Sequence, residues 1–147
     1  MRTVDFSAKV GLAPDETFVL LSDFGSYPSY TETVRNSEVE RLADDRTRTS
    51  WEVNFRNGIL KWVEEEHLQP DDGRIEFQAI GGDLERFDGF WQVTPTDEGC
   101  TVQLHVEFDS GLGTLSDIVE PIAERTLREN FEVILRALVG GEVELVA

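Results

Sequence analysis

Two glutamates on a predicted strand, Glu64 and Glu66, are the residues of this chain best suited to chemistry. Side chains two positions apart on a strand point to the same face, so both carboxyl groups project on the side of Trp62. Burial on an apolar wall disfavours the charged form of a carboxyl group, and a second carboxyl group nearby adjusts its pKa. Such a pair is typical of general acid–base catalysis. We therefore predict Glu64 and Glu66 as catalytic residues, with Glu64 moving the proton and Glu66 tuning it.

The hairpin around Asn57-Gly58 predicts which side chains surround this pair. Asn-Gly is typical of a two-residue type I′ turn, and such a turn sets the register of the two strands that it joins. One face of this hairpin is then apolar and carries both glutamates. The predicted partners on that face are Phe55 with Leu60, Val53 with Trp62, Trp51 with Glu64 and Thr49 with Glu66.

The run Glu64-Glu65-Glu66 also fits an acidic, solvated strand end. A bulge between Trp62 and Glu66 would reverse the alternation and turn these carboxyl groups to solvent. For Glu66, nearer the strand end, this alternative is the favoured one. For Glu64 the two interpretations are equally supported.

The elements that must position these residues follow from hydrophobic spacing. Residues 3–10 alternate as a half-buried strand, and Pro14 opens a helix that continues to about Ser22. A short second helix is predicted around 25–30. Turn signals then divide residues 34–109 into six strands, whose short connections indicate an antiparallel meander. A long apolar helix follows, with its start predicted near Glu120.

These elements predict one α+β domain over residues 1–147. Seven antiparallel strands form a curved sheet that wraps around the long C-terminal helix, and two short helices follow the first strand. One helix cannot fill the whole concavity of such a sheet. The remaining space predicts a pocket for a flat, apolar ligand, although large aromatic residues are more often plain core. The predicted walls are Trp51, Val53, Trp62, Phe77, Phe87 and Trp91, with Tyr27 and Tyr30 at the mouth.

Other kinds of site have little support. His67 and His105 fall on the outward face of their strands, which argues against a histidine triad or an interior zinc site. Cys100 is the single cysteine, so no intrachain disulfide forms. No glycine-rich phosphate loop is present. We therefore expect neither a metal nor a cofactor.

Charge limits the partners of the protein. The 147 residues include 30 Asp and Glu against 13 Lys and Arg, a net charge of −17. Nucleic acid and anionic membranes would repel such a surface. No run approaches the roughly 18 apolar residues of a membrane span, and the N-terminus lacks the pattern of a signal peptide. The expectation is a cytoplasmic monomer or homodimer, without membrane insertion, that binds a hydrophobic small molecule.

The order of these motifs resembles the polyketide cyclase/dehydratase branch of the START-related helix-grip superfamily, which also includes coenzyme Q-binding proteins. The resemblance covers about Val4 to Leu138 and implies a hydrophobic cavity between the sheet and the last helix. The motifs that carry it are Ala13-Pro14-Asp15-Glu16-Thr17-Phe18, Asp23-Phe24-Gly25-Ser26-Tyr27-Pro28, Trp51, Trp62 followed by acid, Gly81-Gly82-Asp83, Gly89-Phe90-Trp91, Glu107-Phe108-Asp109 and Asn130-Phe131.

The resemblance also implies a site and an activity. In aromatase/cyclases of the tetracenomycin type the cavity folds a poly-β-ketone chain for aldol closure and dehydration. This chain has Glu66 in place of their pocket arginine and Glu64 in place of a nearby serine. No residue therefore takes the role of that arginine as an acid or oxyanion holder. The positions that match the pocket lining of that family are Tyr27, Trp62, Phe87, Trp91, Leu104 and Asn130.

Three functions remain open from the sequence. The first is a polyketide cyclase/aromatase-like enzyme that acts on a polyketide or aromatic compound, free or bound to a carrier protein, through carboxylate acid–base chemistry. In it Asn130 orients a carbonyl group. The second is a non-catalytic carrier or chaperone of an isoprenoid, quinone or lipid. The third is a partner-binding domain whose core is filled.

Overall fold

The computed structural model describes residues 2–55, 58–111, 116–140 and 143–146. Its strands form one antiparallel sheet in the order β2-β3-β4-β5-β6-β7-β1-β8. The elements are β1 (Arg2–Val10), α1 (Pro14–Ser22), η1 (Phe24–Ser26), α2 (Tyr27–Tyr30), β2 (Val34–Ala43), β3 (Arg46–Phe55), β4 (Gly58–Gln69), η2 (Pro70–Asp72), β5 (Arg74–Gly82), β6 (Arg86–Thr96), β7 (Gly99–Asp109), α3 (Ser116–Val139) and β8 (Val143–Val146).

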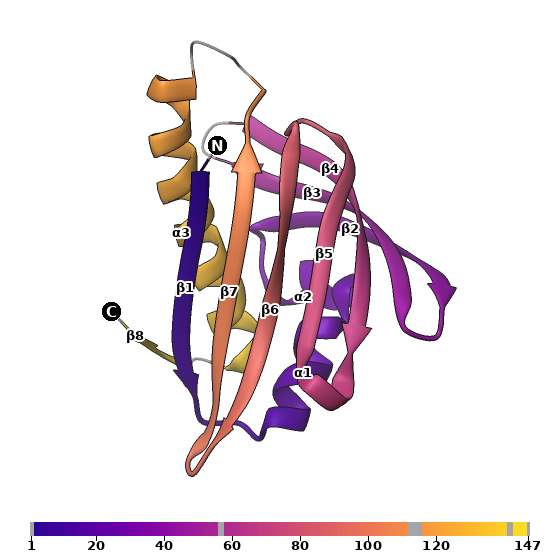
Figure 1. Cartoon of the computed structure of the whole chain (residues 1–147), viewed down its shortest axis with the longest axis vertical. Helices are drawn as coiled ribbons and strands as arrows, with labels where there is room; N and C mark the ends of the chain where they lie inside the picture. The colour runs from indigo at the N-terminus through magenta and orange to yellow at the C-terminus, as the bar shows by residue number, and fades with distance from the viewer. Residues whose placement is uncertain (1, 56–57, 112–115, 141–142, 147) are drawn as a thin grey trace.

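The predicted α+β helix-grip architecture is confirmed. In Figure 1 α3 runs along one face of the sheet behind β1 and β7, and α1 and α2 lie on the same face. One strand more than predicted is present, because β8 follows α3 and pairs with β1 at the sheet edge. The predicted helix start near Glu120 is wrong. The helix begins at Ser116 and carries Pro121 in its second turn, where proline removes a single backbone donor and the helix continues.

The β3–β4 hairpin has a different register from the one predicted. Trp51 lies opposite Trp62, and Phe55 lies opposite Gly58, so Gly58 belongs to the strand. The predicted turn residue Asn57 lies outside the described residues. The four predicted pairs are therefore wrong by a slip of two residues. An even slip keeps every side chain on its face, so the same residues still point inward.

This slip gives the two glutamates new neighbours. Thr49 lies opposite Glu64, and Thr47 lies opposite Glu66. A bulge does occur beside Glu64, but it lies on β5, where the register moves from Val63–Gly81 to Glu64–Ala79. The alternation along β4 is therefore unbroken. The solvated alternative is wrong, since Glu64 is 6% and Glu66 1% exposed.

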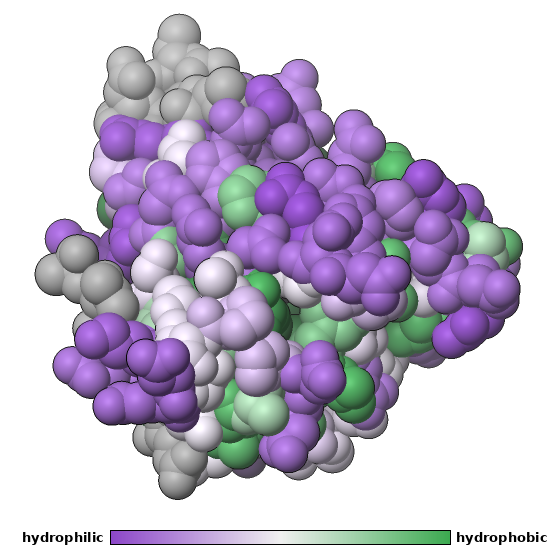
Figure 2. Space-filling model, turned by 60° about the horizontal axis from the view of Figure 1, so that its bottom comes forward, coloured by the Kyte–Doolittle hydropathy of each residue, from purple (hydrophilic) through white to green (hydrophobic). Residues whose placement is uncertain are grey.

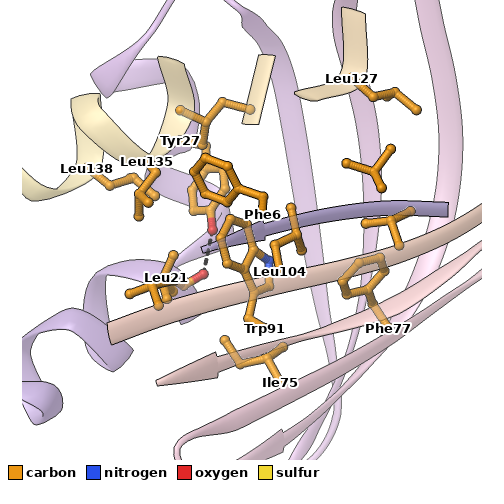
Figure 3. Close-up of a cluster of buried hydrophobic side chains, with 14 of the residues drawn as sticks. Phe6, Leu21, Tyr27, Ile75, Phe77, Trp91, Leu104, Leu127, Leu135 and Leu138 are labelled. Carbon is orange, nitrogen blue, oxygen red and sulfur yellow. Dashed lines mark hydrogen bonds between the residues drawn. The ribbon is translucent and has the colours of Figure 1, made fainter. Parts of the chain in front are cut away.

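The core lies between the inner face of the sheet and the helices. Phe6 and Leu104 pair across β1 and β7, and both are buried beneath Leu127 and Leu135 of α3 (Figure 3). The outer face carries ion pairs such as Arg86 with Glu107. Apolar side chains thus gather mainly on one side of the sheet, as the period-two alternation requires, although Phe90 stacks on His105 on the outer face.

Both histidines lie on the outer face, as predicted. His67 pairs with Asp45 at 3.0 Å between Nε2 and Oδ2, and His105 pairs with Asp5 at 2.6 Å between Nδ1 and Oδ1. Figure 2 shows a surface that is mostly hydrophilic, with hydrophobic residues in patches around its centre and lower half. The acidic excess of the chain is consistent with this surface.

Candidate functional site

Side chains from the sheet and the helices enclose a small cavity of about 50 Å³. Pockets for drug-sized ligands usually measure about 300–1,000 Å³. Most of the expected concavity is therefore filled, and a larger ligand requires side chains to move. The lining residues are Phe24, Tyr27, Val34, Trp51, Val53, Trp62, Glu64, Ile75, Phe77, Phe87, Trp91, Phe131 and Ile134.

Four residues expected at the pocket do not line this cavity, and one of them is the predicted catalytic residue Glu66, which is buried beside it. Tyr30 is 43% exposed on α2, and Leu104 lies deeper in the core. Asn130 donates from Nδ2 to the carbonyl oxygen of Asn54 at 3.0 Å, so its amide ties α3 to β3. The other expected wall residues, Tyr27, Trp51, Val53, Trp62, Phe77, Phe87 and Trp91, all line it.

Tyr27 lies inside the cavity wall instead of at a mouth. Its hydroxyl donates to the carbonyl oxygen of Leu21 at 2.6 Å (Figure 3). Burial raises the pKa of this hydroxyl well above its usual value, and the nearby Glu64 and Glu66 carboxyl groups raise it further. Tyr27 therefore stays neutral, and its proton is already used within the protein.

Sequence reasoning missed five lining residues. They are Phe24, Val34, Ile75, Phe131 and Ile134. Ile75 and Phe77 are two positions apart on β5 and share the inner face, so the alternation of the strand could have identified Ile75. Phe131 and Ile134 lie on the apolar side of α3, but helical spacing does not say which turn of a helix faces a cavity.

The wall around Glu64 is built from aromatic rings in mutual contact. The ring centroids of Trp51 and Trp62 are 6.1 Å apart with a 22° angle between the planes. Tyr27 meets Trp51 at 5.2 Å, and Phe87 meets Trp62 at the same distance. Each ring has few alternative positions in such packing. The two indole N–H groups are therefore held in place.

Two buried carboxyl groups lie close together here, and that of Glu64, but not that of Glu66, lines the cavity. The Nε1–H of Trp62 donates to Glu64 Oε1 at 2.8 Å. The hydroxyls of Thr47 and Thr49 donate to Glu66 Oε1 at 2.8 and 2.9 Å. Within the described residues, no Lys, Arg or His forms an ion pair with either carboxyl group. Neutral donors alone offset their burial.

Burial, followed by the hydrogen bond and charge of Glu66, raises the pKa of Glu64 well above its usual value. Burial also raises the pKa of Glu66, but the neighbouring Glu64 carboxyl group, the hydroxyls of Thr47 and Thr49 and the nearby Trp51 N–H oppose this rise. Of the two carboxyl groups, that of Glu64 therefore favours its protonated form more strongly. Oε2 of Glu66 has no hydrogen-bond donor at normal geometry among the described residues, which favours a protonated neighbour beside it.

We expect the Glu64→Gln variant to gain stability over wild type as the pH rises. The folded-state pKa of Glu64 lies above its unfolded value, so the folded protein binds more protons between the two values. The unfolding free energy of wild type then falls with rising pH, by up to about 1.4 kcal/mol per pH unit for one proton. Glutamine does not titrate and avoids this loss. Urea unfolding from pH 5 to 9 measures the difference.

Glu65→Gln is the matched control. It removes the same formal charge from the same strand, but Glu65 faces outward and pairs with Arg48 at 3.0 Å between Oε2 and Nη2. Exposed ion pairs contribute about 0–1 kcal/mol. Equal pH dependence of Glu64→Gln and wild type would show that Glu64 ionises normally in the fold.

A family model described as "Polyketide cyclase / dehydrase and lipid transport" matches residues 10–133. A curated relative, the ribosome association toxin RatA of Vibrio cholerae, is 27% identical over 110 residues, which make up 74% of this chain and 76% of RatA.

Solved structures share the fold. TTHA0849 from Thermus thermophilus superposes with a TM-score of 0.87 at 23% identity, covering 95% of this chain and 96% of that one. The Zhui aromatase/cyclase from Streptomyces sp. R1128 gives a TM-score of 0.84 at 17% identity, covering 95% and 92%. At these identities the likeness concerns the fold alone.

Proposed function

The chain belongs to the polyketide cyclase / dehydrase and lipid transport family, and we propose that it binds an uncharged aromatic or polyketide carbonyl compound between the sheet and α3. The protein then promotes cyclisation or dehydration of that compound by proton transfer through Glu64. One observation carries the proposal. The carboxyl group of Glu64 lines an aromatic cavity, and a second buried carboxyl group, that of Glu66, lies beside it and raises its pKa further.

Proton transfer starts when the proton of Glu64 moves to Glu66. The Glu64 carboxylate then takes a proton from the carbon between two carbonyl groups, which leaves an enolate. The enolate carbon forms a bond to another carbonyl carbon of the same ligand, and the resulting alkoxide takes the proton back from Glu64. In dehydration Glu64 takes a proton from the neighbouring carbon and delivers it to the departing hydroxyl, which leaves as water.

The raised pKa of Glu64 suits this task. A carboxylate with a raised pKa is a stronger base. A pKa nearer to neutrality favours both the uptake of a proton from the ligand and its return to the ligand. While Glu64 holds the proton, Glu66 carries the charge of the pair, and the hydroxyls of Thr47 and Thr49 stabilise that charge.

Entry of a larger ligand requires the cavity to widen. Phe131 on α3 packs between two sheet residues, with ring centroids 6.4 Å from Phe87 and 6.0 Å from Trp91. It is only partly buried, and moving it breaks no sheet hydrogen bond. We propose that Phe131 is the side chain that gives way.

The Phe131→Ala variant is therefore expected to bind a three-ring ketone such as anthrone about tenfold more tightly than wild type, because the ligand no longer displaces the ring. Calorimetric titration measures the two affinities. Val133→Ala, at a 47% exposed position on α3, is the control and should leave the affinity unchanged. An unchanged affinity in Phe131→Ala would mean that Phe131 is not the side chain that moves when a ligand enters.

The proposal is tested with a compact aryl ketone, 1-tetralone, in D₂O. We expect the protein to accelerate exchange of the hydrogens next to the carbonyl group, followed by ¹H NMR. Native mass spectrometry of the purified protein, then denaturation, identifies any ligand that it already carries. Bound tetralone without accelerated exchange would refute the catalytic part of the proposal.

A non-catalytic carrier of an apolar metabolite is the second candidate. The lining is almost wholly apolar, and binding needs no proton transfer. A stoichiometric apolar ligand released from the purified protein, together with no exchange of tetralone, would favour this function. RatA is a ribosome association toxin, but a net charge of −17 gives no support to a nucleic-acid surface in this chain.

A further inference from the structure

We infer that the indole N–H of Trp51 holds the carbonyl oxygen of the ligand and so places the adjacent carbon beside Glu64. This inference deepens the proposed function and rests on it. It identifies the ligand class as an uncharged ketone, and it assigns Trp51 a role beyond that of an apolar wall.

Trp51 Nε1 is a buried donor without an acceptor. The Trp51 side chain is 6% exposed and lines the cavity, yet its Nε1 makes no hydrogen bond at normal geometry among the described residues. A buried N–H left unpaired loses its hydration and gains nothing in return, which destabilises the fold. Such a group in a cavity wall points to an acceptor brought by a ligand.

The neighbouring donors are already used within the protein. Nε1 of Trp62 donates to Glu64, and the Tyr27 hydroxyl donates to Leu21. The hydroxyls of Thr47 and Thr49 donate to Glu66. Beside the carboxyl pair, Trp51 is therefore the donor that a ligand can engage.

Trp51 is also near the reacting group. Its N–H lowers the pKa of both Glu64 and Glu66, although it forms no hydrogen bond of normal geometry with either. Trp51 lies opposite Trp62, one inner-face pair along the β3–β4 hairpin from Glu64, so the carbon next to a carbonyl oxygen on Trp51 is within the reach of Glu64. When Glu64 removes a proton there, negative charge develops on the same oxygen, and a fixed N–H stabilises that charge.

The surrounding rings hold the donor in place. Trp51 packs edge-on against Phe24 with centroids 5.9 Å apart, and it also contacts Tyr27 and Trp62. A donor positioned before the reaction needs no rearrangement during it. The absence of a cation at the carboxyl pair, within the described residues, disfavours a carboxylate ligand because Glu66 would repel it.

The test compares 1-tetralone with tetralin, the hydrocarbon of the same shape without the oxygen. Trp51→Phe keeps an aromatic wall and removes the N–H. We expect the ratio of tetralone to tetralin affinity to fall about tenfold in Trp51→Phe, the usual effect of one buried hydrogen bond. Exchange in bound tetralone is expected to slow about 100-fold. Val133→Ala, at an exposed position of α3 outside the cavity lining, should leave the affinity ratio unchanged.

A second measurement needs no variant. The indole N–H resonance of Trp51 in wild type should shift strongly with tetralone and weakly with tetralin. An equal affinity ratio in Trp51→Phe and wild type, or equal shifts with both compounds, overturns the inference. Failure of both compounds to bind overturns the inference and the proposed function together. Selective binding through Trp51 without exchange supports the inference and refutes only the proposed catalysis.

Discussion

Replacing Glu64 with glutamine is expected to slow exchange of 1-tetralone by two to four orders of magnitude, the usual contribution of a positioned acid–base group. Glutamine has nearly the same shape, and its Oε1 still accepts the hydrogen bond that Trp62 donates at 2.8 Å. It cannot carry the proton. The affinity for tetralone should therefore stay within about threefold of wild type, while kcat falls. NMR exchange rates and calorimetric affinities separate the two quantities.

The control for this variant is Glu65→Gln, one position along the same strand. Glu65 is on the outer face and bonds to Arg48, so its loss should leave the exchange rate unchanged. A folded Glu64→Gln variant with wild-type kcat would remove Glu64 from the mechanism. Loss of affinity together with kcat would instead assign Glu64 to binding.

Replacing Gly89 with alanine is expected to lower the unfolding free energy by about 3 kcal/mol or more. A Cβ atom at Gly89 would lie 1.8 Å from the carbonyl oxygen of His105 and 2.9 Å from Cα of Val106. Both are backbone atoms of β7, so no side chain can turn away to relieve the contact. Strands β6 and β7 must separate locally, next to the cavity residues Phe87 and Trp91.

Gly81→Ala is the matched control for the backbone. Gly81 is also a strand glycine, on β5, but a Cβ atom there meets nothing within 4 Å. Its replacement should change the unfolding free energy by less than about 0.5 kcal/mol. Urea unfolding of both variants measures the contrast. Equal destabilisation would mean that the close approach of β7 does not constrain position 89.

The faces of the strands could be predicted from local spacing. Trp62, Glu64 and Glu66 share the inner face because alternation is a property of the strand itself, and the long apolar helix had to cover that face. Each side chain of β4 stays on its predicted face, because the register differs from the predicted one by an even number of residues and the bulge lies on β5. The sequence by itself thus determined the fold class and the inward face of the apolar strand residues, but it favoured a solvated Glu66 and left Glu64 undecided, and the structure buries both.

The tertiary structure alone decided how the inward residues meet. The pairing of Thr47 with Glu66 depends on the hairpin register, which the Asn-Gly signal misplaced. The placement of Tyr30, Leu104 and Asn130 away from the cavity depends on where the short helices and α3 settle on the curved sheet. The cavity volume of about 50 Å³ is a small remainder after close packing of residues from distant parts of the chain. The cavity volume cannot be predicted from any local sequence pattern, because it depends on contacts between segments that are far apart in the sequence.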